Sequence, residues 1–431
     1  MSEFIEVEGD IDPCFNIPNQ GKILIISNDQ SYLTHGIHKF PAKFFPELPR
    51  YLIKHYSEPG QTILDPMCGS GTVILEAMLS NRTGVGIDID PIARLITKVK
   101  TTPIERNLLV SATDELIQLI HKRRSAKEST YFIPEFNYRD TWFKRFVLRE
   151  LALIRESIHT VVEAEEDDKS RQDLLDFLKI VFSSIIRDVS NADPHCTRTV
   201  IRKNQVKKIT SGEVIAKFSN ALSKQVQAMI AFSDICGSAG IGTVQLPKGT
   251  AMQTGLNDCS VDLAVTSPPY INAVDYPRTH QLEMYWLGLV EDGPLSNMKR
   301  KYIGTETVYK DEYIRLRTSG FDSLDPLLRK IYNEDPRRSY IAFKFFEDMK
   351  EQLKEIHRVL QPGSHYCVVI GNNVIRGNVV ESHKILTEIA TSDDVGFKID
   401  KSFFSGVIRH FIKIPRKERM AGEWVLVLRK P

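Results

Sequence analysis

Paired cysteines and long apolar runs are both missing from this 431-residue sequence. Its six cysteines form no C-x-x-C pair and have no zinc-ligand spacing, so we expect reduced thiols and no bound metal. No apolar stretch approaches the roughly 20 residues of a membrane span, and the amino-terminal residues lack the basic and apolar regions of a secretion signal. These absences predict a globular cytoplasmic protein that binds neither a membrane nor a metal.

A strong excess of charge of one sign is missing as well. Lysine and arginine number 57 against 55 aspartates and glutamates, which leaves a formal net charge of +2. Any affinity for a polyanion must therefore come from local basic patches. The chain has no internal repeat and no low-complexity tract, and its length is sufficient for a complete core with an additional domain.

The clearest pattern that is present is a glycine-rich turn after a short strand. Residues 62 to 72 form an apolar strand that ends at Asp65 and leads through Gly69 and Gly71 into a helix. The glycines allow a tight turn and a close approach to a ligand, and the start of the helix presents free N–H groups. About 20 residues later a second short strand ends at Asp88, where an acid suits a ribose diol.

A second pattern is the tetrapeptide Ser267-Pro268-Pro269-Tyr270, which directly follows the apolar run Val261–Thr266. The prolines fix φ and remove N–H donors, which leaves outward carbonyls in a rigid loop, and the tyrosine adds an aromatic face. Such a loop can accept hydrogen bonds from an exocyclic amino group while a ring stacks on the tyrosine. Alone, the tetrapeptide could equally be a strand end with a Pro-Pro turn; together with the glycine-rich turn and the spaced acid it indicates a nucleobase site.

These residues resemble the S-adenosylmethionine-dependent amino-methyltransferases of DNA, in the Ser-Pro-Pro-Tyr form of the N4-cytosine/N6-adenine family. The resemblance covers about residues 33 to 100 and 243 to 431. It implies an α/β, Rossmann-like class I methyltransferase fold with a mainly parallel central sheet. It also implies a cytoplasmic, nucleoid-associated enzyme of a bacterium or archaeon. The implied partners are double-stranded DNA and a separately encoded restriction endonuclease.

The resemblance also assigns residues to roles, and it implies that the upstream segment, residues 35–46, covers the methionine end of the cofactor. Asp88 is the expected ribose acid, with Asp90 as the alternative register, and Thr250 stands where the family often has Asp beside the adenine amino group. The expected catalytic residues are Ser267, Pro268, Pro269 and Tyr270. The residues expected to bind S-adenosylmethionine are Phe40, Pro41, Ala42, Asp65, Pro66, Met67, Cys68, Gly69, Ser70, Gly71, Thr72, Asp88, Ile89, Thr250 and Ala251.

The chain divides into regions of different pattern. Residues 33–100 and 243–431 alternate between strands and helices, which predicts an α/β catalytic domain. Residues 101–242 carry apolar faces at helical spacing, over 148–158 and 174–182 for example, and predict a helical insertion domain. Residues 1–32 form an N-terminal extension with a strand over Lys22–Ile26.

Two insertions are candidates for DNA recognition. One is the helical region 101–242, by its position in the chain; the other is 280–340, which interrupts the catalytic domain beside the strand ends where ligands bind. Basic residues in them would contact phosphates, and a solvated basic face is the competing interpretation. The expected DNA-binding residues are Arg198, Arg202, Lys203, Lys207 and Arg300. Residues 409–419 are a further basic stretch, which we expect to be a surface loop.

The chemistry of an amino group narrows the reaction. Two acceptors, Ser267 Oγ and the Pro268 carbonyl, can hold both amino hydrogens and free the nitrogen lone pair for attack on the sulfonium methyl group. In the resembling family serine before Pro-Pro favours cytosine N4, so we predict methylation of a flipped cytosine stacked on Tyr270, with adenine N6 as the alternative. Methylation at carbon 5 requires a thiol nucleophile after a proline and is set aside, since Cys68 belongs to the glycine-rich turn.

Two functions of other classes stay open. The first is an RNA or protein-glutamine methyltransferase, because related Pro-Pro-Tyr loops serve both. The second is a non-catalytic DNA-binding protein of the same fold, although intact Asp65, Asp88 and Ser267 argue against it. For His35 and His38, contact with the cofactor or substrate and packing in the core are both open.

Overall fold

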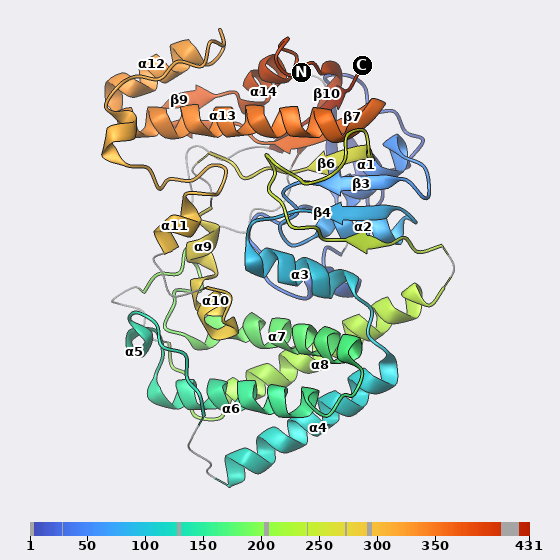
Figure 1. Cartoon of the computed structure of the whole chain (residues 1–431), viewed down its shortest axis with the longest axis vertical. Coiled ribbons are helices and arrows are strands. Elements are labelled where there is room, and N and C mark those ends of the chain that lie inside the picture. The colour runs from blue at the N-terminus through green and yellow to red at the C-terminus, as the bar shows by residue number, and fades with distance from the viewer. Residues whose placement is uncertain are drawn as a thin grey trace.

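The central feature of the molecule is a nine-stranded sheet, seen near the top of Figure 1. The computed structural model describes residues 4–27, 29–126, 131–201, 207–238, 240–271, 274–290, 295–406 and 422–431. The strand order is β1-β2-β10-β11-β7-β6-β3-β4-β5, and a separate two-stranded sheet joins β8 to β9. The strands are β1 (Ile5–Glu8), β2 (Lys22–Ile26), β3 (Thr62–Asp65), β4 (Thr83–Gly86), β5 (Val244–Gln245), β6 (Val261–Thr266), β7 (Leu360–Ile370), β8 (Asn373–Ile375), β9 (Asn378–Val380), β10 (Lys398–Gly406) and β11 (Gly422–Arg429).

The sheet is mainly parallel, which confirms the predicted fold class. Only β11 runs against its neighbours, β10 and β7; the pairs from β7 through β6, β3 and β4 to β5 are parallel. The predicted strand Lys22–Ile26 is confirmed as β2, and it pairs with β10. Residues 5–26, which we expected to precede the catalytic domain, thus contribute two strands to its sheet.

Helices cover both faces of the sheet because its strands are apolar on both sides. On one face, Leu263 and Val265 of β6 pack with α1 (Glu47–Tyr56) and α2 (Thr72–Leu79). On the other face, Ala264 of β6 packs with the long α13. The helices of this second face are α12 (Asp325–Glu334), α13 (Pro336–Val359) and α14 (Ser382–Ala390).

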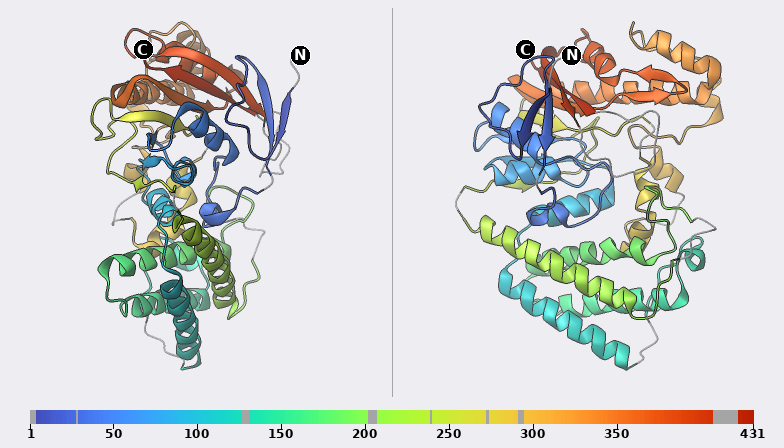
Figure 2. Two further views of the ribbon diagram at one scale, coloured as in Figure 1. Left: turned by 90° about the vertical axis from the view of Figure 1, so that its right-hand side faces the viewer. Right: turned by 180° about the vertical axis from the view of Figure 1, so that it is seen from behind.

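Below the sheet in Figure 1 lies a separate layer of helices. The described part of residues 101–242 is helical, as expected, and contains no strand. Figure 2 shows these helices stacked beneath the sheet from two further sides. They are α4 (Arg106–Ser125), α5 (Arg139–Trp142), α6 (Arg145–Val162), α7 (Asp168–Val189) and α8 (Glu213–Cys236). Their apolar faces form one core that extends to α3 (Pro91–Thr101) of the sheet region.

The helices α9 to α11, at the start of the insertion 280–340 and just before it, connect the two layers in Figure 1. The helix α10 (Gln281–Leu287) packs on α7, and the fully buried Trp286 meets the rings of Phe143 and Phe182 edge-on, with centroids 6.1 and 5.9 Å away. The other short elements are η1 (Leu33–Gly36), α9 (Tyr276–Thr279), α11 (Leu295–Lys299) and η2 (Lys310–Tyr313). Among the described residues, no helix is both long and apolar enough to cross a membrane.

Candidate functional site

The ends of three neighbouring parallel strands bring the predicted motifs together. The strands β3, β4 and β6 lie side by side, with β3 in the middle. Their carboxyl ends therefore place Asp65, Asp88 and Ser267 at one edge of the sheet, although the three residues are far apart in the sequence. Strand β3 pairs with β4 on one side, to which the chain runs next, and with β6 on the other. In open α/β sheets, ligands bind at such a position, beyond the carboxyl ends of the strands.

Asp65 fixes the start of the glycine-rich turn. Its Oδ1 accepts hydrogen bonds from the Thr266 hydroxyl at 2.7 Å and from the Met67 N–H at 3.1 Å. The side chain is 3% exposed, and burial raises the pKa of this carboxyl to about 7 against the opposing effect of the two hydrogen bonds. Asp65 thus ties the end of β3 to the end of β6, and with it the turn to the tetrapeptide.

Asp88 fixes the other end of the same turn. One carboxylate oxygen accepts from the Gly69 N–H at 2.8 Å and the other from the Asp90 N–H at 2.8 Å. Each oxygen keeps a lone pair for a further donor, such as a ribose hydroxyl. Asp90 instead caps α3 by accepting from Ile92 N at 3.0 Å, and its second oxygen is buried. Burial raises the pKa of Asp88, and that of Asp90 to about 7.

The two glycines of the turn are required by its geometry. Gly69 and Gly71 have φ of +50° and +74°, which side chains other than glycine rarely adopt. A Cβ on Gly71 would lie 2.6 Å from the Thr97 side chain, and one on Gly69 would lie 3.3 Å from the ring of Phe40. The turn is therefore pressed between α3 and the segment that carries Phe40.

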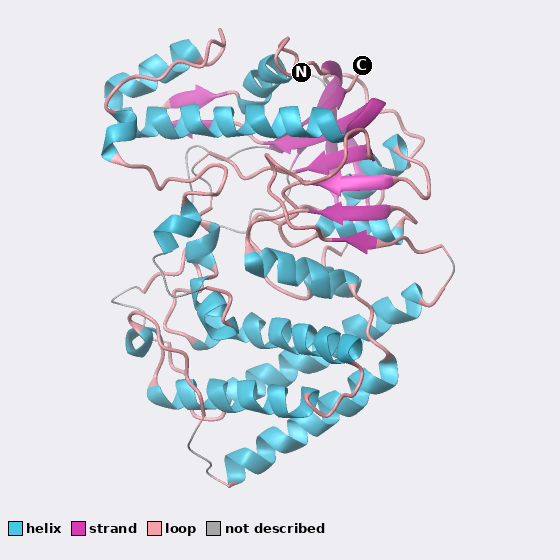
Figure 3. Ribbon diagram, in the orientation of Figure 1, coloured by secondary structure: helices cyan, strands magenta, loops and turns pink. Residues whose placement is uncertain are grey.

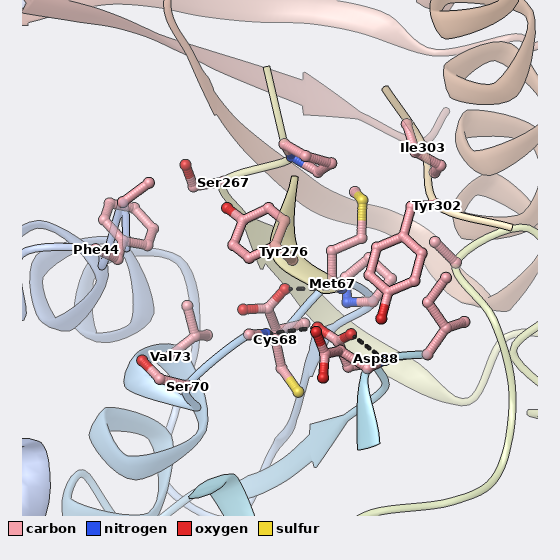
Figure 4. A pocket seen from close by; sticks show the side chains of 18 of the residues that line it. Phe44, Met67, Cys68, Ser70, Val73, Asp88, Ser267, Tyr276, Tyr302 and Ile303 are labelled. Carbon is pink, nitrogen blue, oxygen red and sulfur yellow. Dashed lines mark hydrogen bonds between the residues drawn. The ribbon is translucent and has the colours of Figure 1, made fainter. Parts of the chain in front are cut away.

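A pocket opens above this turn, and Figure 4 shows it from close by. Most of the residues expected to bind the cofactor line it, as do two residues of the tetrapeptide, Ser267 and Pro269. The expected cofactor residues in the lining are Phe40, Ala42, Asp65, Pro66, Met67, Cys68, Gly69, Ser70, Thr72, Asp88, Ile89, Thr250 and Ala251. The lining does not include Pro41 or Gly71.

The wall beside Ser267 is aromatic, and one of its rings was not anticipated from the sequence. Tyr276 lines the pocket, and Figure 4 shows its ring between Ser267 and Tyr302. The ring of Phe40 stacks on Tyr276 at 5.5 Å and on His280 at 5.3 Å. Tyr276 begins a helix with Pro277 behind it and Asp275 as its cap, so a Pro-containing helix start six residues after the tetrapeptide was the available signal.

Tyr270, the residue expected to stack on the base, is held by the last strand of the sheet. Its hydroxyl donates to Glu423 of β11, and the residue does not line the pocket; neither does Pro268. Burial, followed by the neighbouring Glu423, raises the pKa of Tyr270 well above its usual value, and burial likewise raises the pKa of Glu423. Glu423 is 153 residues away in sequence, and only strand pairing brings it to the tetrapeptide.

Other lining residues were not named individually as cofactor contacts from the sequence. Lys43 and Phe44 follow the predicted cofactor segment, Met252 follows Ala251, and Tyr302 is contributed by the insertion 280–340. The Tyr302 hydroxyl is buried and interacts with the Asp90 carboxylate, and burial together with Asp90 and Asp88 raises its pKa. The complete set of unanticipated lining residues is Lys43, Phe44, Val73, Met252, Tyr276, Lys301, Tyr302 and Ile303, beside Asp90.

The two histidines of the upstream segment serve packing. His35 Nε2 lies 2.8 Å from Glu76 Oε1, and His38 Nε2 lies 2.9 Å from Ser183 Oγ. Burial lowers the pKa of both rings to about 4, so both are neutral near pH 7. Neither lines the pocket; they fix the segment that carries Phe40 against α2 and α7.

The expected DNA-binding residues that the structure describes have different partners. Arg198 is partly exposed, with Nη2 3.7 Å from Glu306 Oε1. The Lys207 amine donates to the Arg187 carbonyl at 3.1 Å, near the end of α7. Arg300 donates to both carboxylate oxygens of Glu312, at 3.0 and 3.1 Å. Arg202, Lys203 and the basic stretch 409–419 lie outside the described residues.

A correction concerns carbon-5 methylation. The sequence does contain a proline followed by cysteine, at Pro13–Cys14. Cys14 is exposed and lies between β1 and β2, and it is not among the residues that line the pocket. Cys68 does line the pocket, but burial raises the pKa of its thiol well above the usual value, so it is not a thiolate nucleophile. The ground for setting carbon 5 aside is therefore the position and ionisation of the thiols.

The lining fits S-adenosylmethionine in its chemistry. Asp88 supplies acceptors for a ribose diol, Ile89, Ala251 and Ile303 offer apolar contact to an adenine ring, and Tyr276 lies beside Ser267. No group of three or more metal-ligating side chains is found in the described structure.

Comparisons with known proteins agree with this chemistry. Residues 16–98 match the family model described as DNA methylase. The chain is 25% identical to a Type II methyltransferase, M.MvaI, of Kocuria varians, over 84% of this chain and 82% of that protein. It is 23% identical to another, M.BsoBI, of Geobacillus stearothermophilus, over 88% and 81% of the two chains.

Solved structures give only faint likenesses. A SAM-dependent methyltransferase of Methanosarcina mazei has a TM-score of 0.30 at 12% identity, over 88% of this chain and 96% of that one. A putative DNA modification methylase of Thermus thermophilus has a TM-score of 0.23 at 18% identity, over 42% and 54%. These scores carry no weight beside the matched family model and the relatives. On the latter evidence, the chain is similar to the N4/N6 amino-methyltransferases among DNA methylases, most directly over residues 16–98.

Proposed function

We propose that this protein transfers the methyl group of S-adenosylmethionine to the exocyclic N4 amino group of a cytosine flipped out of double-stranded DNA. The observation that carries the proposal is the position of Ser267. It lines the cofactor pocket beside Tyr276 and directly follows β6, which is tied to the glycine-rich turn through Thr266 and Asp65.

When bound, S-adenosylmethionine supplies an electrophilic methyl group on a sulfonium sulfur. Ser267 Oγ and the Pro268 carbonyl accept the two amino hydrogens of the base and favour a tetrahedral nitrogen with a free lone pair. The new bond forms between this nitrogen and the methyl carbon while the carbon–sulfur bond breaks, and the surplus proton leaves the nitrogen for water. Positioning and electrostatics supply the rate, as expected for a reaction without a covalent enzyme intermediate.

The residue before the two prolines supports cytosine over adenine. A serine hydroxyl both donates and accepts, so Ser267 can accept from the amino group or donate to the ring N3 of cytosine. The pKa of Tyr270 is raised well above its usual value, so it stays a neutral phenol, held by Glu423. We assign Tyr270 the role of holding the loop and stacking the flipped base.

The adenosine end of the cofactor is assigned to Asp88, Ile89, Thr250 and Ala251. Thr250 lines the pocket where the family often has an acid, so we assign the adenine amino group no carboxylate partner there. The remaining expected residues of the glycine-rich turn, from Asp65 to Thr72, are assigned to the sulfonium and methionine part.

We assign DNA recognition to the two insertions, because the sheet edge alone has no surface for reading several bases. The first part of the insertion 280–340 shares the core of the helical layer through α10 and α7, so these two parts would contact DNA as a single body. Ile303, Leu324 and Leu328 of the same insertion pack in the core of the sheet instead. The relatives are named as Type II methyltransferases, and a separately encoded endonuclease of the same specificity is the partner that this context implies.

The direct test is mass spectrometry of nucleosides from duplex DNA treated with the full chain and S-adenosylmethionine labelled on its methyl group. Labelled N4-methylcytosine is the expected product. Labelled N6-methyladenine would overturn the choice of base and keep the role of the loop. Label found only in RNA or protein would overturn the function. Ser267→Ala, which keeps the Pro268 carbonyl, should reduce the label without abolishing it.

A further inference from the structure

A carboxylate of the last strand, Glu423, lies at the same edge of the sheet as the tetrapeptide. Strand β11 runs antiparallel to β7, and Trp424 pairs with Ile370 at the end of β7. Strand β6 runs parallel to β7 on its other side, with Thr266 opposite Val368. Because an antiparallel strand begins where its neighbours end, the start of β11 lies at the carboxyl edge of the sheet, two strands away from β6.

The side chain of Tyr270 joins these two strand ends. Its hydroxyl donates to a carboxylate oxygen of Glu423. A hydrogen bond from the Ser267 side chain reaches the same phenol and opposes the rise of its pKa, as expected for a hydroxyl that donates to the phenol oxygen. The hydrogen bonds therefore run in one direction, from the Ser267 hydroxyl through the Tyr270 hydroxyl to the Glu423 carboxylate.

The two ends of this hydrogen-bonded chain differ in surroundings and in basicity. Ser267 lines the cofactor pocket, whereas Tyr270 and Glu423 do not. Burial raises the pKa of Glu423, and the hydrogen bond from Tyr270 opposes the rise, so this carboxylate accepts a proton more readily than a solvated one. The pKa of Tyr270 lies well above its usual value, so the phenol can give up its proton only when it receives another.

We propose that Ser267, Tyr270 and Glu423 form a relay through which the surplus proton of the reaction leaves the base, an inference that rests on the proposed function for its amino-group substrate. As the bond forms between the amino nitrogen and the methyl carbon, one N–H bond breaks and its proton goes to Ser267 Oγ. The hydroxyl proton of Ser267 moves to Tyr270, and that of Tyr270 moves to Glu423. The carbon–sulfur electron pair stays on the sulfur, so a sulfonium and a carboxylate become a thioether and a carboxylic acid, and the total charge is unchanged. Glu423 then releases the proton to water.

The relay separates the roles of the two acceptors that hold the amino group. A carbonyl oxygen such as that of Pro268 has no hydrogen to pass on, whereas a hydroxyl can accept one proton and release another. Pro268 therefore only positions the amino group, and Ser267 is the acceptor that can carry the proton away. Glu423 touches neither base nor cofactor and acts through the two hydroxyls, by taking up the positive charge that methyl transfer places on the nitrogen.

The test is Glu423→Gln in the full chain, because the glutamine carbonyl still accepts the Tyr270 hydrogen bond but cannot take up a proton. The single-turnover rate of methyl transfer should fall about tenfold, less than the factor of about a hundred or more that a base in direct contact supplies. Tyr270→Phe, which keeps the ring and interrupts the relay, should lose the same factor. The double variant should lose no more than either single one, because both changes break one chain of hydrogen bonds. The affinity for S-adenosylmethionine should stay unchanged in all three.

Heavy water separates a relay from a purely structural hydrogen bond. The single-turnover rate of the unmodified protein should fall in heavy water, and it should follow a curve against the deuterium fraction because several protons move together. In Glu423→Gln and in Tyr270→Phe this dependence should become smaller and linear. The matched control is Glu388→Gln on α14, whose carboxylate also accepts from a hydroxyl, that of Ser323, and does not line the pocket. It should keep both the rate and the curve.

Three results would overturn the inference: an unchanged rate in Glu423→Gln, losses that multiply in the double variant, or the heavy-water curve of the unmodified protein in Glu423→Gln. The last, together with a lower rate, would make Glu423 a structural support of Tyr270 only. If Glu423→Gln binds no cofactor, the heavy-water response of Tyr270→Phe decides. Labelled N6-methyladenine in place of N4-methylcytosine would overturn the proposed function and keep the inference, because an adenine amino group loses the same proton. If no amino group is methylated in any substrate, both fail.

Discussion

The sheet edge and the helical layer differ in how their polar side chains are paired. At the sheet edge, the buried Thr72 hydroxyl has no partner in the described structure, and the buried Asp90 carboxylate and Tyr302 hydroxyl interact only weakly with each other. In the helical layer, the charged groups of Lys207 and Arg187 donate hydrogen bonds to backbone carbonyl oxygens, at the end of α7 and in the segment that follows it. Because an unpaired buried polar group costs about 1–3 kcal/mol, unpaired atoms gathered around a pocket indicate a ligand, whereas paired charges indicate stability.

One cluster between the two regions does not fit this division. His280 and Glu283 of α10 are buried with unpaired polar atoms, although they lie in the core behind Phe40 and not in the pocket. We therefore expect different effects of substitution at three places. Substitutions at the sheet edge should change ligand binding or methyl transfer, those at this junction should change how stability depends on pH, and those in the helical layer should change stability or DNA contact.

The largest effect is expected at Tyr270. Tyr270→Ala removes the stacking face, worth about 1–3 kcal/mol, and leaves the buried Glu423 without its donor, a further cost of about 1–3 kcal/mol. The rate of methyl transfer in single-turnover assays should fall at least about a hundredfold, and Tyr270→Phe, which keeps the ring, should cost about tenfold.

The affinity for S-adenosylmethionine should distinguish Tyr270 from Tyr276. It should stay unchanged in Tyr270→Ala and Tyr270→Phe, because Tyr270 does not line the pocket. It should fall in Tyr276→Ala, because Tyr276 lines the pocket and stacks on Phe40. If Tyr270→Ala instead weakens the cofactor and leaves single-turnover rates unchanged, the assignment of Tyr270 to the base is wrong.

The next effect is expected at Asp88. Asp88→Ala removes an acceptor for the ribose and the acceptor that holds the Gly69 N–H. We expect S-adenosylmethionine to bind more weakly by about 1–3 kcal/mol, measured by calorimetry. Asp140→Ala, on the exposed α5, is the control and should change nothing. A larger loss in Asp90→Ala than in Asp88→Ala would show that the ribose acid is the second of the two registers.

The sequence predicts the sheet edge well because local patterns determine it. The sequence predicts where two strands end: one is followed by Asp65 and two glycines, the other by Ser-Pro-Pro-Tyr. Parallel pairing then brings these strand ends together. Glu423 escaped prediction because it reaches Tyr270 only through the register of β11.

The surroundings of the basic residues in the two insertions could not be predicted from the sequence. A run of basic residues in sequence says nothing about whether each side chain meets a carbonyl, a carboxylate or solvent. Lys207 binds the end of α7 and Arg300 pairs with Glu312, while Arg198 stays partly exposed. Three residues of one predicted class therefore have three different surroundings, and only one of them still has the exposure that a phosphate contact requires.

A smaller, pH-dependent effect is expected at the junction. Burial raises the pKa of Glu283 to about 7 from a usual value of 4.5, so the folded state keeps its proton where the unfolded state has lost it. Stability from this group is complete below about pH 4.5 and is lost as the pH rises toward 7. Glu283→Gln should raise stability at pH 8 by up to about 3 kcal/mol and flatten the decline between pH 4.5 and 7.

Denaturant unfolding across that range measures the effect. Arg187 and Asp188 on α7, with His280 and His38, are the charged or titratable groups around Glu283. Asp234→Asn, which changes an exposed acid of α8, is the control and should leave the slope with pH unchanged. If Glu283→Gln is destabilising at pH 8 as well as at pH 5, the carboxyl is a paired anion in the folded state.

The smallest effect is expected at Arg198. Its guanidinium is partly exposed and lies 3.7 Å from Glu306, too far for a strong hydrogen bond, so it can turn to a phosphate. Arg198→Ala should weaken binding to cognate and unrelated duplexes alike by about 1 kcal/mol and reduce the slope of log affinity against log salt by about one. Lys207→Ala should lower stability and leave that slope unchanged, since its amine is bound to the end of α7. If Arg198→Ala changes the sequence preference and leaves the salt slope unchanged, Arg198 contacts bases and not phosphates. If Lys207→Ala changes the salt slope, the distinction between paired and unpaired charges in the helical layer is wrong.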